Sequence, residues 1–302
     1  MSHAVVIVSG GDALSPFTTP DLACSTGLAA GNTGTYLRER LLAAGHQAFT
    51  APAMNTRGPV LDAEPGSFGA FGGQPQVLPA HMTIWSTADI DLAGEHLTRF
   101  MTYLHHTEGV DSVSWVGHSN GGLYATAASA IMRATGHPVA VVSLVTLGTP
   151  WCGTVPIQVG VGELDESVLM GDERALAILA GGRSAAARDK GLIREDTRAY
   201  LLGERGWGAS QIGGLDGVPT LLIAGGYLEH EGGHEWVWPF DGLVSEYSAL
   251  AVDVPAGLIP DRRTASFPLL HSIFFADLAG LPWETGLTWN PQVAELVVEH
   301  LA

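Results

Sequence analysis

The residues G-H-S-N-G at positions 117–121 have the types and spacing of a sharp turn that presents a nucleophilic serine. A strand-like apolar run over 111–116 comes directly before them, and a run of small residues with helical character over 123–131 comes directly after. In a strand–turn–helix arrangement the hydroxyl of Ser119 projects beyond the sheet edge, and the glycines are needed because the strand and helix backbones nearly touch. Because the motif is common in a chain with 39 glycines, the sequence around it has to support the prediction.

A second motif, H-E-G-G-H at 230–234, matches the H-E-x-x-H pattern of zinc proteases. That chemistry requires both histidines on one face of a helix, four residues apart. The two glycines inside the motif cost a helix roughly 2 kcal/mol together. We therefore expect a polar loop and no catalytic metal, and binding of a structural metal by His230 and His234 stays open as an alternative.

The composition bounds the class of protein. A chain of 302 residues with 46% hydrophobic and 15% charged residues can bury a substantial core. Its net charge of −17 argues against binding to nucleic acid or to anionic membranes, since both are negatively charged. The two cysteines, Cys24 and Cys152, are either free or joined in one bridge. The sequence begins without a basic and apolar leader, so we expect a cytoplasmic protein, although a secreted protein whose leader had been removed would look the same.

The elements expected to position Ser119 alternate between strands and helices, which predicts a mostly parallel sheet covered on both faces. Residues 53–85, rich in glycine and proline, predict a long loop, and residues 155–216 predict a helical insertion with helices at 172–181 and 192–202. We expect a single domain over 1–302. Strands are expected over 4–8, 47–51, 111–116, 139–147, 219–224 and 249–254, and helices over 34–44, 88–106, 123–134 and 293–301.

Four segments together resemble the α/β-hydrolase superfamily, and within it the bacterial lipase and carboxylesterase branch. The resemblance implies an α/β sheet of about six strands that lacks the superfamily's first two strands, with helices on both faces and a helical lid or cap. One departure is Ser9, which stands where these enzymes usually carry a histidine. The segments are V-S-G-G at 8–11, G-H-S-N-G-G at 117–122, L-G-T-P-W-C-G at 147–153 and D-G-L-V-S at 241–245, with His271 and Ser272 following at the expected distance.

The resemblance implies a catalytic triad of Ser119, Asp241 and His271, in the chain order of the superfamily. Ser119 would attack an acyl carbon, His271 would act as general base and acid, and Asp241 would orient the imidazole. Among later histidines only His300 competes, at the end of a helix. The alternatives to Asp241 are Asp216, which precedes its strand, Asp253, expected inside the last strand, and Asp261, expected in the loop that presents the histidine.

The oxyanion of such a reaction would be held by the backbone N–H groups of Asn120 and Gly11, with Gly10 or Asp12 as alternatives to Gly11. The resemblance also implies that the loop and the insertion lie over the carboxyl edge of the sheet. Their apolar side chains would bind an acyl chain or an aryl group, or would pack the insertion onto the core. The candidates for the substrate site are Trp85, Trp151, Val155 and Trp238. Phe68 and Phe71 lie in the same loop as Trp85, over 53–85.

The expected function is therefore hydrolysis of a small-molecule carboxylic ester, without a cofactor. Two other functions are compatible with the sequence. An acyltransferase would use the same three residues with an acceptor other than water, and a hydrolase fold can serve as a binding module without catalysis. The oligomeric state, the length of the acyl chain and the mobility of the insertion are not predicted.

Overall fold

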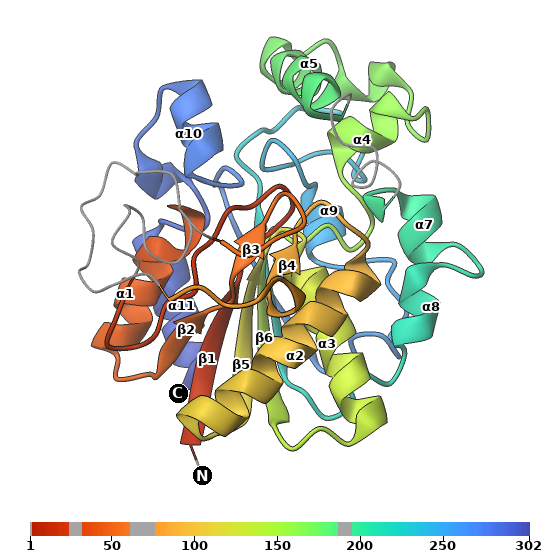
Figure 1. Cartoon of the computed structure of the whole chain (residues 1–302). Coiled ribbons are helices and arrows are strands. Elements are labelled where there is room, and N and C mark those ends of the chain that lie inside the picture. The colour runs from red at the N-terminus through yellow and green to blue at the C-terminus, as the bar shows by residue number, and fades with distance from the viewer. Residues whose placement is uncertain (1, 24–31, 61–75, 187–194) are drawn as a thin grey trace.

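The computed structural model describes residues 2–23, 32–60, 76–186 and 195–302 (Figure 1). Its strands are β1 (Ser2–Val8), β2 (Ala48–Thr50), β3 (Ala53–Met54), β4 (Ile84–Trp85), β5 (Val110–His118), β6 (Ala140–Leu147), β7 (Thr220–Gly225) and β8 (Arg262–Phe267). Its α-helices are α1 (Thr35–Ala43), α2 (Ile90–Glu108), α3 (Gly121–Thr135), α4 (Val155–Gly160), α5 (Glu173–Ala186), α7 (Arg198–Leu202), α8 (Trp207–Gln211), α9 (Glu246–Ala249), α10 (Ile273–Ala279) and α11 (Pro291–Leu301). Short 3₁₀ turns span Asn32–Gly34, Ala80–Met82, Glu166–Leu169 and Trp283–Thr285.

Six strands form one parallel sheet in the order β2-β1-β5-β6-β7-β8, which confirms the predicted sheet. The strand β1 shows why both faces must be covered. Ala4, Val6 and Val8 belong to one apolar cluster, whereas Val5 and Ile7 belong to another on the opposite face. All five are buried, as expected for a strand inside a parallel sheet with helices on both sides.

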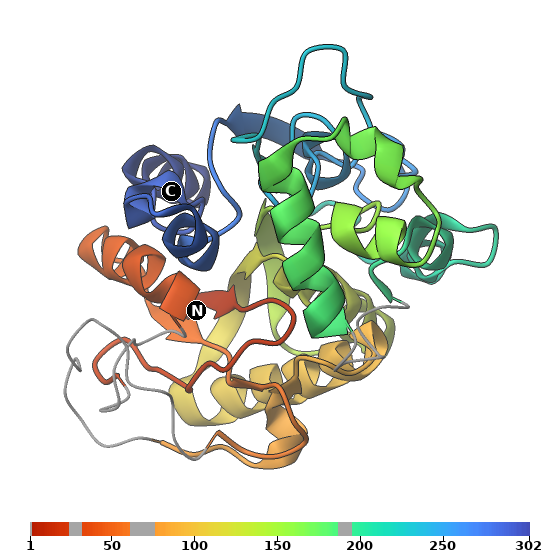
Figure 2. The ribbon, with the colours of Figure 1, turned by 90° about the horizontal axis from the view of Figure 1, so that it is seen from above.

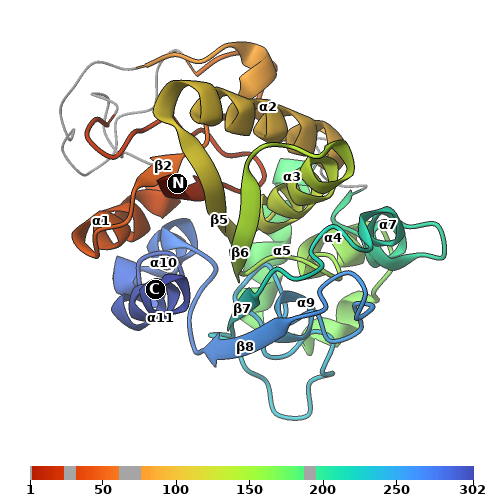
Figure 3. The ribbon, with the colours of Figure 1, turned by 90° about the horizontal axis from the view of Figure 1, so that it is seen from below.

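The two faces carry different helices (Figures 1 and 3). Helices α2 and α3 pack on one face, where Leu97, Phe100 and Leu123 join the cluster of β1 and β5. Helices α1 and α11 pack on the other face, where Leu41 and Val297 join the second cluster. The helix α2 begins after Asp89 and ends at Gly109, which adopts the left-handed conformation that a glycine allows at a helix end.

The described part of the segment 155–216 contains the helices α4, α5, α7 and α8. Helices α4 and α5 lie over the carboxyl ends of the strands, whereas α7 and α8 lie beside α3 (Figures 1 and 2). An apolar cluster joins the insertion to the chain that follows β7. Val155, Val159 and Leu179 come from the insertion, whereas Trp238 and Phe240 come from the later loop. The insertion is therefore anchored beside the edge where residues that follow the strands come together.

The prediction of a strand over 249–254 is wrong. Helix α9 occupies 246–249, and turns follow to residue 254. The sixth strand of the sheet is instead β8, whose residues are half-buried or exposed because it lies at the sheet edge. An edge strand needs few apolar residues, so the sequence of β8 has no apolar run that would predict a strand. The turn that contains Ala251 and Val254 is buried, and its apolar residues look like those of a buried strand.

The loop expected over 53–85 holds more structure than predicted. Its ends form β3 and β4, which pair in parallel as a separate two-stranded sheet. Residues 61–75, with Phe68 and Phe71, lie outside the described residues, as does Cys24. No helix in the described part of the chain is both long enough and apolar enough to span a membrane.

Candidate active site

Ser119 sits in the turn between β5 and α3, with a backbone φ of 55°. A left-handed conformation is uncommon for a residue with a side chain, and it persists only where the surrounding structure imposes it. Here the Ser119 N–H donates to the carbonyl of Leu147 at 2.9 Å, and Thr149 donates to the carbonyl of Ser119 at 2.8 Å. The strand β6 and the loop after it therefore hold the serine in its strained turn.

Two glycines allow the turn at Ser119 to pack closely against β1 and the loop that follows it. A Cβ on Gly121 would lie 2.1 Å from the carbonyl oxygen of Val8, and one on Gly10 would lie 2.5 Å from the Cβ of Ser119. Neither position has room for a side chain. The close approach places the loop after β1 directly beside the serine.

His271 and Asp241 form a buried pair. The Asp241 Oδ2 lies 2.7 Å from His271 Nδ1, and the backbone N–H of His271 donates to the carbonyl of Asp241 at 2.9 Å. Asp241 Oδ1 accepts from the backbone N–H groups of Leu243 and Val244 at 2.9 and 2.7 Å. The Asp241 side chain is fully buried, and three hydrogen bonds fix its carboxylate, which in turn orients the imidazole.

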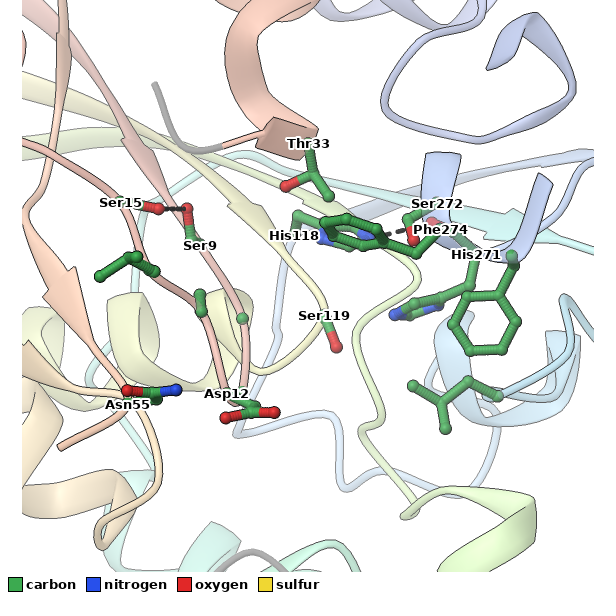
Figure 4. A pocket seen from close by; sticks show the side chains of 16 residues that line it. Ser9, Asp12, Ser15, Thr33, Asn55, His118, Ser119, His271, Ser272 and Phe274 are labelled. Carbon is green, nitrogen blue, oxygen red and sulfur yellow. Dashed lines mark hydrogen bonds between the residues drawn. The ribbon is translucent and has the colours of Figure 1, made fainter. Parts of the chain in front are cut away.

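The second ring nitrogen of His271, Nε2, is buried and has no hydrogen-bond partner among the described residues. Figure 4 shows Ser119 and His271 facing the same space. Because Nδ1 is bonded to Asp241, Nε2 is the nitrogen left to exchange a proton with a group in that space. The three predicted residues therefore come together from three parts of the chain. Ser119 follows β5, Asp241 lies in the loop after β7, and His271 lies in the loop after β8.

The sequence places His118 beside the turn without a catalytic role, and the structure adds that it contacts His271. Its Nε2–H donates to the carbonyl oxygen of His271 at 3.0 Å, and the two ring centroids lie 4.7 Å apart. Burial, together with the nearby charge of His271, lowers the pKa of His118 to about 3. His118 is thus a neutral donor that positions the backbone of His271. Its place inside the G-x-S-x-G motif was the signal.

The N–H groups predicted to hold an oxyanion lie on both sides of Ser119. Those of Gly11 and Asn120 have no hydrogen-bond partner within the described ranges, whereas that of Asp12 donates to the carbonyl of Ser86 at 3.2 Å. Asp12 is therefore an unsuitable alternative to Gly11, and Gly10 stays one. Asp12 itself has a φ of 54°, so the loop after β1 turns sharply beside the serine.

A cavity of about 410 Å³ opens at Ser119. Asp12 and Asn55 lie on one side of it and His271 on the other (Figure 4). Apolar side chains of Leu243, Phe274 and Phe275 complete the side of His271. Sequence reasoning missed this lining, although Phe274 and Phe275 lie only three and four residues after His271. The lining residues are Ser9, Gly10, Gly11, Asp12, Ala13, Leu14, Ser15, Thr33, Asn55, His118, Ser119, Leu243, His271, Ser272, Phe274 and Phe275.

The four residues predicted for the substrate site do not line this cavity. Trp151 is buried in the core cluster to which residues of α2 and α3 also belong, and Val155 and Trp238 belong to the cluster that anchors the insertion. Trp238 also donates to the carbonyl of Val168 at 2.8 Å. Trp85 is half-buried in β4. Trp151, Val155 and Trp238 therefore pack in apolar clusters, which was the alternative role for these side chains.

The segment 230–234 forms a turn and not a helix, with Gly232 at a φ of 74°. The rings of His230 and His234 pack against different tryptophans, Trp238 and Trp236. The described part of the chain contains no group of three or more His, Cys, Asp or Glu residues arranged to hold a metal ion. Cys152 is a buried free cysteine, and burial raises the pKa of its thiol to about 11.

Comparison with known proteins fits this geometry. Residues 80–163, which include the turn at Ser119, match the family described as "Putative serine esterase (DUF676)". Lipase BlEst2 from Bacillus licheniformis, in its propeptide form, is similar with a TM-score of 0.54 and 13% identity, over 98% of this chain and 50% of that chain. Lipase B from Aspergillus fumigatus is similar with a TM-score of 0.50 and 13% identity, over 99% of this chain and 52% of that chain.

This chain spans about half the length of those two lipases. No curated protein matches it in sequence. At such low identity the likeness shows the fold alone, and the chain has the α/β-hydrolase fold.

Proposed function

We propose that the protein is a serine hydrolase of carboxylic esters, with Ser119 as nucleophile, His271 as general base and acid, and Asp241 as the orienting carboxylate. The observation that carries the proposal is the buried 2.7 Å contact between His271 and Asp241, which leaves Nε2 facing the cavity of Ser119. A histidine fixed in this way has one nitrogen to move a proton and one to hold its partner.

In the proposed reaction the Ser119 Oγ attacks the acyl carbon as His271 Nε2 takes its proton. The carbonyl oxygen becomes an oxyanion, stabilised by the free N–H groups of Gly11 and Asn120. The intermediate collapses, His271 returns the proton to the leaving alcohol, and an acyl group stays on Ser119. Water then repeats the steps to release the acid, with His271 again as base and acid.

The shape of the surroundings supports an acyl or aryl group on the side of α10. Phe275 lines the cavity at Ser119 and also a second, mainly apolar groove of about 410 Å³ between α5 and α10. Ile178, Leu278 and Leu281 line that groove as well. We propose that it receives the acyl chain, with the helical insertion acting as a cap over it. The net charge of −17 favours small esters as partners over nucleic acid or an anionic surface.

The test is hydrolysis of p-nitrophenyl esters from acetate to palmitate by the wild type and by Ser119→Ala. We expect turnover by the wild type and a loss of about 10⁶-fold in kcat for the variant, as for a nucleophile removed from such a triad. Equal activity in both proteins would contradict the proposal. An acceptor-dependent product that forms faster than the free acid would instead identify an acyltransferase.

A further inference from the structure

The cavity of the candidate active site has two unlike walls. Phe274 and Phe275 line it on the side of His271, whereas Asp12 and Asn55 lie on the opposite side (Figure 4). Asp12 is the only acidic residue among the described lining residues, and they include no lysine or arginine. A molecule bound against this second wall therefore meets a negative charge that no lysine or arginine of the described lining offsets.

The backbone of Asp12 is held in a fixed position beside the serine. Its φ is 54°, in the left-handed region that aspartate tolerates better than most residues. Its N–H donates to the carbonyl of Ser86 at 3.2 Å, and the same carbonyl accepts from the hydroxyl of Tyr124 at 3.0 Å. Since Tyr124 lies in α3, the helix that follows Ser119, one set of contacts positions both the nucleophile and Asp12.

The side chains of this wall are available to a ligand. The carboxylate of Asp12 is exposed and makes no hydrogen bond or ion pair with another residue of the described ranges. The same is true of the amide of Asn55, whose backbone carbonyl accepts from the Thr87 hydroxyl at 2.9 Å. The carboxylate and the amide oxygen are therefore two acceptors on fixed backbones, and left-handed residues such as Asp12 cluster at functional sites.

We propose that Asp12 is a specificity-determining residue that selects esters whose alcohol portion carries a protonated amine, with Asn55 as a second acceptor. The inference rests on the proposed function, in which the acyl group lies toward Phe275. The tetrahedral carbon bonded to Ser119 directs the acyl and alcohol portions apart, so the alcohol portion lies along the wall of Asp12. There the N–H of the amine donates to the carboxylate in a charge-assisted hydrogen bond.

Charge decides between the classes of alcohol. Asp12 repels an anionic alcohol, and no lysine or arginine of the described lining is there to bind one. A neutral hydroxyl can donate to the carboxylate, but it gains no Coulomb attraction. The net charge of −17 raises the concentration of cations near the protein. A cation paired with Asp12 also offsets the effect of this carboxylate on an oxyanion held by the adjacent Gly11. Esters of amino alcohols therefore fit this wall better than esters of polyols or hydroxy acids.

The test compares two esters of the same shape. The amine of 2-(dimethylamino)ethyl butyrate is protonated at neutral pH, and 3-methylbutyl butyrate has a C–H in place of that N–H. Titration of the released acid gives the ratio of the two kcat/KM values, cationic over neutral. We expect this ratio to fall by about fivefold in Asp12→Asn, the upper end for a pair of partly solvated charges. The ratio does not depend on the fraction of active enzyme, and asparagine tolerates the left-handed backbone of this position.

Asp21→Asn is the matched control. Asp21 is exposed and does not line the cavity, so the variant loses the same charge from the chain without changing the wall. Its ratio should equal that of the wild type, and the wild-type ratio should decline as sodium chloride is raised from about 0.15 M to about 1 M. An unchanged ratio in Asp12→Asn, or an equal fall in both variants, would overturn the inference and leave ester hydrolysis standing.

Binding of the two esters to Ser119→Ala tests the inference without relying on activity. Titrations followed by NMR should give a Kd about fivefold lower for the cationic ester, and adding Asp12→Asn to Ser119→Ala should remove the difference. Equal Kd values for the two esters would overturn the inference even if the wild type hydrolyses esters. A preference for the cation in a protein without esterase activity would support the role of Asp12 and contradict only the proposed function.

Discussion

At the scale of single residues, the site depends on how firmly one imidazole is held. Asp241 fixes the ring of His271 through Nδ1, and His118 fixes the backbone of His271 through its carbonyl. Both partners are buried, so water does not compete for these bonds. The imidazole is therefore oriented before any substrate arrives.

We predict that Asp241→Asn lowers kcat for a p-nitrophenyl ester by about 10⁴-fold, because an amide favours the wrong tautomer of His271. The amide keeps the shape of the carboxylate, so the fold should be retained. Steady-state kinetics together with circular dichroism would check both parts. Asp261→Asn is the control, because that aspartate precedes β8 and does not line the cavity. A variant of Asp241 with nearly normal kcat would contradict the role of the carboxylate.

Sequence reasoning found the residues whose chemistry comes with a local pattern. Ser119 lies in the G-x-S-x-G motif, and Asp241 lies in the D-G-L-V-S segment at 241–245. Phe275 carries no such pattern, because an aromatic residue in a helix has the same sequence signature in many structures. Its position depends on how α10 folds over the sheet, which involves contacts distant in sequence.

At the scale of elements, the close packing of α3 against β1 fixes the position of Ser119 relative to the sheet. Gly121→Ala would place a methyl group against the carbonyl of Val8. We predict a loss of about 1–3 kcal/mol in the free energy of unfolding, since overpacking forces the backbones apart. Chemical denaturation would measure it.

The control for that prediction is Gly160→Ala, because a Cβ on Gly160 meets nothing within 4 Å. Equal stability of the Gly121 and Gly160 variants would show that α3 and β1 are not in tight contact.

The groove between α5 and α10 gives a prediction about substrate choice. Ala177 lines it from α5, so Ala177→Trp should fill the groove. We expect kcat/KM for octanoate and longer esters to fall by about tenfold relative to acetate, since each buried methylene contributes roughly 0.8 kcal/mol. Ala180→Trp, on the same helix and outside the groove lining, is the control. An unchanged chain-length profile would place the acyl chain elsewhere.

The same elements show where sequence patterns stop being informative. Strands β1, β5, β6 and β7 are buried on both faces, and their apolar runs predicted them. The edge strand β8 has Arg262, Arg263 and Thr264 in place of an apolar run. The position of α10 was likewise missed, because the helix has only seven residues and begins two residues after His271.

At the scale of the whole molecule, the main feature is an excess of negative charge. A net charge of −17 on a compact chain produces self-repulsion that the unfolded chain can relieve by expanding. We predict that raising sodium chloride from about 0.01 M to about 0.15 M, which shortens the Debye length from about 30 Å to about 8 Å, stabilises the fold. Calorimetry should show an increase of about 2–4 °C in Tm. A Tm that falls or stays constant would mean that local ion pairs outweigh the net repulsion.

The central claim is that Ser119 carries the acyl group, and covalent trapping tests it most directly. The wild type, Ser119→Ala and Asp241→Asn would each be incubated with an alkyl fluorophosphonate and measured by intact and peptide mass spectrometry. The account predicts one adduct per wild-type chain, located on the peptide that contains Ser119, slower labelling of Asp241→Asn and none of Ser119→Ala. An adduct on another residue, or equal labelling of wild type and Ser119→Ala, would contradict it.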